Sequence, residues 1–244
     1  MASSRDPRRS TPMKPPIRLL PLGDSALTIE FGNDIDPEIN ERVIAFAAMV
    51  RAQAWNGLLD VVPTYRSATI HFDPLRMETD TLSALLTDLT RTIPDEPVPS
   101  GTIHTIPVCY GGEHGLDLED IAAFARLSPT DAIRLHASIS YRVYMLGFSP
   151  GFPYLGSVPA QLAMPRLATP RTKVPAGSVG IAGHQTGIYP TATPGGWRII
   201  GRTPLKLYRL TSTHPFLLNP GDSVQFKPIR PDEFDRLQQE HDRD

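Results

Sequence analysis

The stretch PRTKVPAGSVGIAGHQTGIYPTATPGGWRIIGRTP occupies residues 170–204 and decides the fold of the second half of the chain. Short apolar runs at 179–182 and 197–200 alternate here with glycine and proline. Ten of the 18 glycines lie between Gly147 and Gly201. Short strands separated by Gly/Pro turns are typical of a compact β-barrel or sandwich. We expect further strands at 205–210 and, after the Asn-Pro-Gly-Asp turn, at 223–226.

The segments on either side carry other signals. Upstream, the patterns predict a strand at 103–110, helices at 117–126 and 128–137, and a strand at 141–146. Downstream, a surface helix is expected at 231–241. The first third predicts the order β-β-α-β-β-α over 17–92, which implies a small α+β sandwich. In that part, Asp36-Pro37 should cap one helix, which ends at Asn56-Gly57, and Thr79 or Asp80 should cap the second.

These signals predict an α+β chain with a small N-terminal domain and a C-terminal β-barrel. The expected parts are a disordered leader at 1–16, an α+β domain at 17–92, a proline-rich connector at 93–101, a barrel domain at 102–230, and a helix with tail at 231–244.

Composition excludes several classes of function. The net charge of −2 over 244 residues argues against a nucleic-acid partner, which requires a concentrated basic face. Cys109 is the only cysteine, so no internal disulfide can form. No apolar run approaches the ~18–20 residues of a membrane helix, so we expect no membrane association. The sequence thus favours a cytoplasmic protein.

Familiar catalytic motifs are absent or broken. Residues 147–151, GFSPG, fit the G-x-S-x-G elbow, but Pro150 follows the serine and cannot donate the backbone N–H that an oxyanion hole requires. No phosphate-binding glycine loop of the Walker or dinucleotide type occurs, and no metal-binding motif does either. We therefore expect neither a bound cofactor nor a metal on this chain alone.

Polar side chains concentrate within the glycine-rich stretch. The candidates are Arg171, Lys173, His184, Gln185, Thr186, Tyr189, Trp197 and Arg202. Cationic donors next to exposed backbone N–H groups suit a small carboxylate or a phosphorylated intermediate. We predict that Arg171 and Arg202 bind an oxyanion and that His184 transfers a proton. The alternative for each residue is a structural role.

An aromatic loop precedes this cluster. The segment PGFPYLG and the residues just before it place Phe148, Phe152, Tyr154 and Leu155 on a proline-stiffened loop. We predict that this loop, with Phe148 and Phe152 as its substrate contacts, forms an apolar wall of a groove or a partner contact. The alternative is a hydrophobic plug that closes one end of the barrel. The two alternatives are compatible if only some of the rings face the barrel interior.

The segment YRVYMLGFSPGFPYLG at 141–156, together with 170–204, closely resembles the allophanate hydrolase subunit 1 family over about residues 17–229. That family includes the B subunit of the prokaryotic ATP-dependent 5-oxoprolinase and a sporulation-kinase inhibitor. The resemblance implies a cyclophilin-like barrel and a polypeptide that is inactive alone. It also implies two partners in the 5-oxoprolinase: the C subunit, of the allophanate hydrolase subunit 2 family, and the A subunit.

The reaction implied by this resemblance is the ATP-dependent opening of the lactam 5-oxo-L-proline to L-glutamate, with ATP used by the complex. Two alternatives stay open. One is a regulatory module that inhibits a sensor histidine kinase, and the other is a subunit that metabolises urea or allophanate. The barrel fold by itself does not imply prolyl isomerase activity, because the chemistry of the site decides function.

Overall fold

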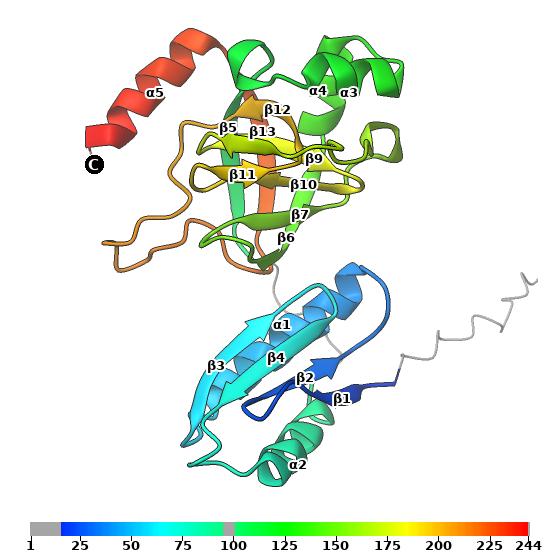
Figure 1. Cartoon of the computed structure of the whole chain (residues 1–244), viewed down its shortest axis with the longest axis vertical. Helices are drawn as coiled ribbons and strands as arrows, with labels where there is room; N and C mark the ends of the chain where they lie inside the picture. The colour runs from blue at the N-terminus through cyan, green and yellow to red at the C-terminus, as the bar shows by residue number, and fades with distance from the viewer. Residues whose placement is uncertain (1–15, 95–100, 244) are drawn as a thin grey trace, which may run out of the picture. The chain divides into compact units, whose positions relative to one another are not determined.

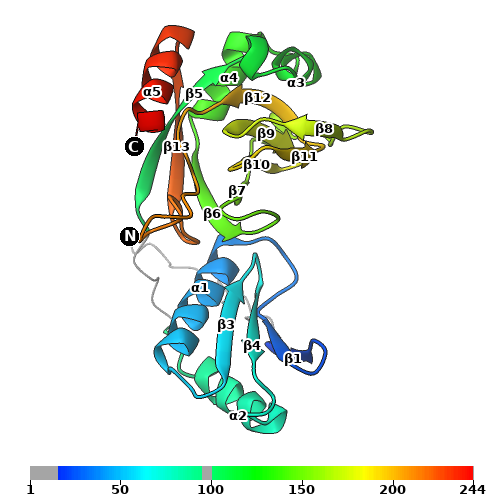
Figure 2. The same cartoon turned by 60° about the vertical axis from the view of Figure 1, so that its left-hand side comes forward.

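The computed structural model describes residues 16–94 and 101–243 (Figures 1 and 2). The chain divides into two compact units, of which the first contains residues 16–62 and 66–93 and the second contains 63–65 and 101–243. The predicted leader at 1–16 falls outside the described residues apart from Pro16. Of the predicted connector at 93–101, residues 95–100 also fall outside the described residues.

The first unit is a four-stranded sheet with two helices. Its strand order is β1-β2-β4-β3, and β2 pairs antiparallel with both β1 and β4. Helix α1 packs against β4 and α2. The elements are β1 (Arg18–Pro21), β2 (Ala26–Glu30), α1 (Pro37–Ala52), β3 (Leu58–Pro63), β4 (Ser67–Phe72) and α2 (Thr79–Thr90). This order is the predicted one.

Local chemistry explains where the helices of this unit begin and end. Oδ1 of Asp36 accepts hydrogen bonds from the backbone N–H groups of Glu38 and Ile39, as the Asp-Pro pair predicts. The predicted cap of α2 was wrong by one residue, since Glu78 occupies that position and makes no side-chain cap bond. Helix α1 ends at Ala52, before the predicted Asn-Gly stop.

The second unit is a closed barrel with helices packed on it. The order around the barrel is β10-β7-β6-β13-β5-β12-β9, and β5 with β13 is its parallel pair. The barrel strands are β5 (Ile103–Tyr110), β6 (Ser140–Leu146), β7 (Pro153–Gly156), β9 (Ser178–Ala182), β10 (Gln185–Ile188), β12 (Arg198–Arg202) and β13 (Ser223–Ile229). The predicted fold class, α+β with a cyclophilin-like β-barrel, is confirmed.

The remaining elements of this unit surround the barrel. Strands β8 (Arg171–Val174) and β11 (Thr193–Gly195) form a separate antiparallel pair. Helix α3 contacts β12, α4 contacts β13, and α5 contacts β5 (Figure 1). The helices are α3 (Leu118–Ala125), α4 (Pro129–Ala137) and α5 (Pro231–Arg243), with short 3₁₀ turns η1 (Gly112–His114) and η2 (Ala160–Leu162).

A buried histidine ties α4 to the barrel interior. His136 is 1% exposed, its Nδ1 lies 2.9 Å from the hydroxyl of Tyr110, and its Nε2 lies 3.1 Å from Oγ1 of Thr186. Its ring stacks on Phe226 at 4.7 Å. Burial lowers the pKa of His136 from 6.5 to about 3, so the imidazole is neutral at physiological pH.

The predicted strand at 205–210 is not formed. Residues 203–222 run as an irregular loop between β12 and β13, in which Tyr208 and Phe216 make an isolated bridge. Within this loop the N–H of Arg209 donates to the carbonyl of Pro215. The backbone of this apolar run therefore makes hydrogen bonds within the loop instead of pairing with a barrel strand.

Among the described residues, no helix combines the length and the apolar character that crossing a bilayer requires.

Candidate functional site

One side of the barrel unit carries a small cavity, which we call the aromatic pocket. Its volume is about 240 Å3. The rings come from the β6–β7 loop, from β7, and from the segments that follow β10 and β11. The lining consists of Phe148, Phe152, Tyr154, Arg166, Pro170, Tyr189, Pro194, Gly195, Gly196 and Trp197. Small-molecule sites are usually apolar clefts with a few polar groups, and this composition fits that description.

Phe152 is the centre of the aromatic pocket. It is 1% exposed, and its ring makes edge-to-face contacts with four others, at centroid distances of 5.6 Å to Phe148, 5.0 Å to Tyr154, 5.2 Å to Tyr189 and 5.3 Å to Trp197. Such pairs add about 0.5–1.5 kcal/mol each beyond their buried area. The pocket wall is therefore rigid.

Phe148 differs from the other rings because it is 64% exposed. Its φ of 67° is a backbone conformation that bulky residues rarely adopt. The aromatic loop is thus both a plug, through buried Phe152, and an exposed rim, through Phe148. The buried ring agrees with the plug alternative, and the role of the exposed ring in a groove or a partner contact stays a prediction.

Glycines make room for these rings. A Cβ at Gly195 would lie 2.8 Å from ring atoms of Tyr189 and closer still to its hydroxyl. A Cβ at Gly187 would lie 3.0 Å from the rings of both Phe152 and Trp197. The sequence pattern suggested that the glycines give access to the backbone, whereas at these two positions they permit aromatic packing.

The polar groups of the aromatic pocket are a cation and a phenol. Arg166 is exposed, and its guanidinium carbon lies 5.9 Å from the centre of the Trp197 ring. No carboxylate among the described residues forms a salt bridge with Arg166. Burial raises the pKa of Tyr189, so its hydroxyl is neutral and can donate a hydrogen bond. The pocket can thus hold a small ring with a carboxylate.

Arg171 lies outside this pocket and has an internal partner. Its Nη2 lies 2.8 Å from Oδ1 of Asp117, a residue that is 3% exposed. The other oxygen, Oδ2, accepts the backbone N–H of Ile199 at 2.6 Å. Arg171 therefore links β8 to the start of α3 and to β12.

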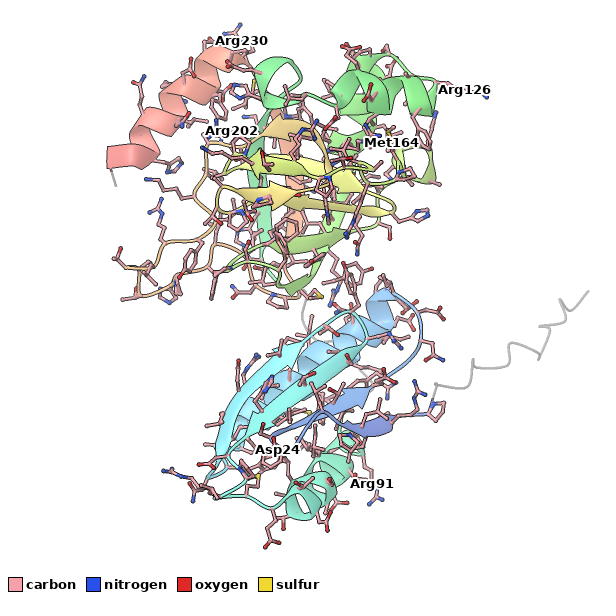
Figure 3. The ribbon with its side chains drawn as sticks, in the orientation of Figure 1. Asp24, Arg91, Arg126, Met164, Arg202 and Arg230 are labelled. Atoms are coloured by element: carbon pink, nitrogen blue, oxygen red, sulfur yellow. The ribbon has the colours of Figure 1, made fainter. Side chains whose placement is uncertain are left out.

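Arg202, whose side chain is labelled in Figure 3, also has internal partners. Its Nε donates to the carbonyl of Ala176 at 2.8 Å, and its guanidinium carbon lies 5.7 Å from the centre of the Phe234 ring in α5. The side chain thus connects β12 with the turn before β9 and with the C-terminal helix.

His184 lies at the opposite end of β9 from Arg202. Arg202 pairs with Ser178, the first residue of β9, whereas His184 is an exposed residue in the turn after Ala182, the last one. Ser178 and Ala182, the two ends of β9, are four residues apart, which corresponds to about 13 Å along an extended strand. The structure therefore places His184 and Arg202 at different ends of β9, and the roles of Arg171 and Arg202 in binding an oxyanion and of His184 in transferring a proton stay predictions.

The other polar candidates also lie outside the aromatic pocket. Lys173 is exposed on β8, and Gln185 begins β10 opposite Ala182. Thr186 is fully buried, and its hydroxyl donates to the carbonyl of Gly180 in the barrel interior. Of the predicted residues, Phe148, Phe152, Tyr189 and Trp197 line the aromatic pocket.

Tyr154, which was expected on the aromatic loop, is part of the lining of the aromatic pocket. Two other residues of this region were not predicted as site residues. Arg166 precedes the glycine-rich stretch in a segment with no pattern, so no signal indicated it. Asp117 was assigned only to a helix start, and its role depends on a contact 54 residues along the chain with Arg171.

The GFSPG segment forms a turn rather than a nucleophile elbow. The N–H of Phe152 donates to the carbonyl of Ser149, and the N–H of Gly147 donates to that of Phe152. Oγ of Ser149 is buried and has no hydrogen-bond partner among the described residues. A serine nucleophile needs an adjacent base, and nothing in these contacts supplies one. Nor do the described residues gather three potential metal ligands at one place.

Comparison with known proteins identifies the family. Residues 17–218 match the family model described as carboxyltransferase domain, subdomain C and D. The chain is 41% identical over 229 residues to the 5-oxoprolinase B subunit of Bacillus subtilis (strain 168). The aligned region covers 90% of this chain and 95% of that protein. The chain belongs to the family of 5-oxoprolinase B subunits. The predicted family is confirmed.

Other 5-oxoprolinase B subunits and related structures match over different lengths. The B subunit of Escherichia coli O157:H7 is 56% identical over 130 residues, or 53% of this chain and 60% of that protein. The crystal structure of TTHA0988 superposes with a TM-score of 0.76 at 38% identity and covers 84% of this chain. This chain spans only 40% of TTHA0988, so that protein is considerably longer than the matched region.

Proposed function

We propose that this chain is the B subunit of an ATP-dependent 5-oxoprolinase and that its aromatic pocket binds the lactam substrate. The observation that carries the proposal is the 41% identity to the 5-oxoprolinase B subunit of Bacillus subtilis across 95% of that protein. The reaction is 5-oxo-L-proline plus ATP and water giving L-glutamate, ADP and phosphate.

The chemistry of the lactam explains why ATP is required. An unactivated amide resists attack by water because its nitrogen is a poor leaving group. Transfer of the γ-phosphoryl group of ATP to the amide oxygen, with release of ADP, activates the carbonyl carbon. One water adds to this carbon, and collapse of the tetrahedral intermediate breaks the ring C–N bond, so that the nitrogen becomes the amine and the carbon an acyl phosphate. A second water hydrolyses the acyl phosphate to the side-chain carboxylate of glutamate and inorganic phosphate.

The aromatic pocket suits the substrate in size and polarity. A volume of about 240 Å3 lies below the usual range for drug-sized ligands, as expected for a single five-membered ring. The rings of Phe152 and Trp197 can pack on the faces of the lactam. Arg166 can pair with its carboxylate, and Tyr189 can donate to its carbonyl oxygen. These groups bind and orient the substrate.

The chain lacks the remaining machinery in its sequence, where no nucleotide-binding glycine motif occurs. We propose that the A subunit and the C subunit, the latter of the allophanate hydrolase subunit 2 family, supply it. ATP is then used by the assembled complex, and this chain binds no cofactor alone. The greater length of TTHA0988, of which this chain spans 40%, supports a functional unit larger than this polypeptide.

Reconstitution tests whether the chain is part of such a complex. The chain is purified with the products of the neighbouring genes, and glutamate release from 5-oxoproline is measured with and without ATP. We expect activity only from the complete mixture with ATP, and none from the chain alone. Equal activity from the mixture that lacks this chain would refute its membership in the complex. Allophanate and urea serve as alternative substrates.

Fluorescence tests the pocket assignment separately. The sequence has two tryptophans, Trp55 and Trp197, so Trp55→Phe leaves one reporter in the aromatic pocket. Titration with 5-oxoproline should change its emission saturably. Arg166→Gln should weaken binding about tenfold, since a hydrogen bond to a charged group contributes about 1.5–3 kcal/mol.

The matched control for Arg166→Gln is Arg134→Gln, an exposed arginine on α4 that pairs with Asp131. It should leave the titration unchanged. No response of Trp197 to 5-oxoproline, in the chain or in the assembled complex, would refute the pocket assignment and leave membership in the complex standing.

A further inference from the structure

A second cavity lies in the loop that joins β12 to β13, and we call it the loop pocket. Its volume is about 390 Å3. Residues 205–217 supply most of its lining, and His241 of α5 supplies the rest. It shares no lining residue with the aromatic pocket.

The loop pocket is basic. Its titratable lining residues are Lys206, Arg209, His214 and His241, and no described carboxylate lines it. The guanidinium of Arg209 has no ion pair or hydrogen bond with any residue that the structure describes. An unpaired arginine among other nitrogen donors is available to an external anion.

Other donors surround this arginine. Nζ of Lys206 donates to the carbonyl of His241 at 2.7 Å and has a further interaction, so this side chain adds positive charge to the pocket. Nδ1 of His241 is buried and has no hydrogen-bond partner within the described chain. Ser212 adds a hydroxyl to the lining.

We propose that the loop pocket is a binding site for a phosphate group, as inorganic phosphate or as the phosphate of a small molecule. A phosphate carries nearly two negative charges, which suit the charge of the Arg209 guanidinium and the Lys206 ammonium, and several acceptor oxygens, which match donors on the guanidinium, the imidazoles and the Ser212 hydroxyl. One carboxylate would leave most of these donors unpaired. Phe216 and Leu217 form an apolar wall that can cover an organic group attached to the phosphate.

This inference does not depend on the lactam assignment, because the two pockets have different linings. Isothermal titration calorimetry of the full chain tests it, with inorganic phosphate, ADP and acetate as separate titrants at constant ionic strength. We expect saturable binding of inorganic phosphate, and at least tenfold weaker binding of acetate. The ADP titration shows whether the apolar wall adds affinity to the phosphate group.

Matched variants locate the binding. Arg209→Gln should weaken phosphate binding about tenfold or more, as the loss of one charge-assisted pair implies. Arg236→Gln removes the same charge from an exposed α5 residue paired with Glu240, and should change the affinity less than about twofold. His214→Gln provides a second pocket variant if Arg209→Gln alters the circular dichroism spectrum.

The proposal is overturned by any of three results: no saturable phosphate binding in the unmodified chain, equal losses in Arg209→Gln and Arg236→Gln, or acetate binding as tight as phosphate binding. Weakened phosphate binding with an unchanged Trp197 response to 5-oxoproline would show that the loop pocket is a separate site. Loss of the Trp197 response alone bears only on the lactam assignment.

Discussion

Replacing Arg171 with methionine should destabilise the barrel unit rather than remove a ligand contact. The guanidinium lies 2.8 Å from the carboxylate of Asp117, a residue that is 3% exposed, so the substitution leaves a buried charge without its main partner. Breaking a buried pair typically costs about 3–5 kcal/mol. The side chain of Arg171 is 27% exposed, and Nη1 of Arg198 lies 3.9 Å from the same carboxylate oxygen. These two facts reduce the expected cost to about 2–3 kcal/mol.

Urea unfolding of the purified chain, followed by hydrogen exchange of barrel amides, measures this cost. A double-mutant cycle with Asp117→Asn should give a coupling energy of about 1–2 kcal/mol, since both single changes disrupt the same contact. Arg236→Met is the control, because its partner Glu240 lies at a shorter distance, 2.6 Å, but both side chains are more than half exposed. That pair should contribute only about 0.3–0.5 kcal/mol.

The opposite result would refute this reasoning. If Arg171→Met unfolds like the unmodified chain and the reconstituted complex loses binding of 5-oxoproline, then Arg171 contacts the substrate and its pairing with Asp117 is incidental. If Arg171→Met and Arg236→Met cost the same, burial of Asp117 does not govern the strength of the pair.

Three further predictions concern other parts of the chain. Gly195→Ala should displace Tyr189 and cost about 1–3 kcal/mol in thermal unfolding, whereas Gly196→Ala, whose nearest neighbours would lie at 3.7 Å, should be tolerated; equal effects would contradict the packing argument. His136 has its pKa lowered to about 3, so between pH 6.5 and that value the unfolded chain binds a proton that the folded chain does not, and stability should fall as pH falls, by up to about 1.4 kcal/mol per pH unit. Unfolding at pH 7 and pH 5 should show a smaller pH effect in His136→Gln, and an unchanged effect would assign the dependence to other groups. Asp36→Ala removes two N-cap hydrogen bonds and should cost about 1 kcal/mol in urea unfolding of the first unit, and Asp36→Asn should restore most of it.

Much of the fold could be predicted because it depends on local patterns. The Asp36-Pro37 pair and the apolar spacing after it give α1 its start and its buried face. The alternation in 68–72 gives β4, in which every second residue is buried. The segment at 205–210 was predicted wrongly for the same reason. Its apolar run resembles a strand, but pairing depends on which other strand has a free edge, and that is not encoded locally.

The site divides in a similar way. The residue types and their order along the chain indicated an aromatic loop with Phe148 and Phe152 and, further along, a polar cluster that includes Tyr189 and Trp197. That these four rings line one pocket became visible only in the folded barrel. The partner of each arginine, by contrast, depends on the tertiary structure. A guanidinium interacts strongly only with an oxygen a few ångströms away; the fold places the carboxylate of Asp117 beside Arg171, but it places no described carboxylate beside Arg166 or Arg209. The sequence shows which residues are charged, whereas their partners depend on contacts between residues that are distant along the chain.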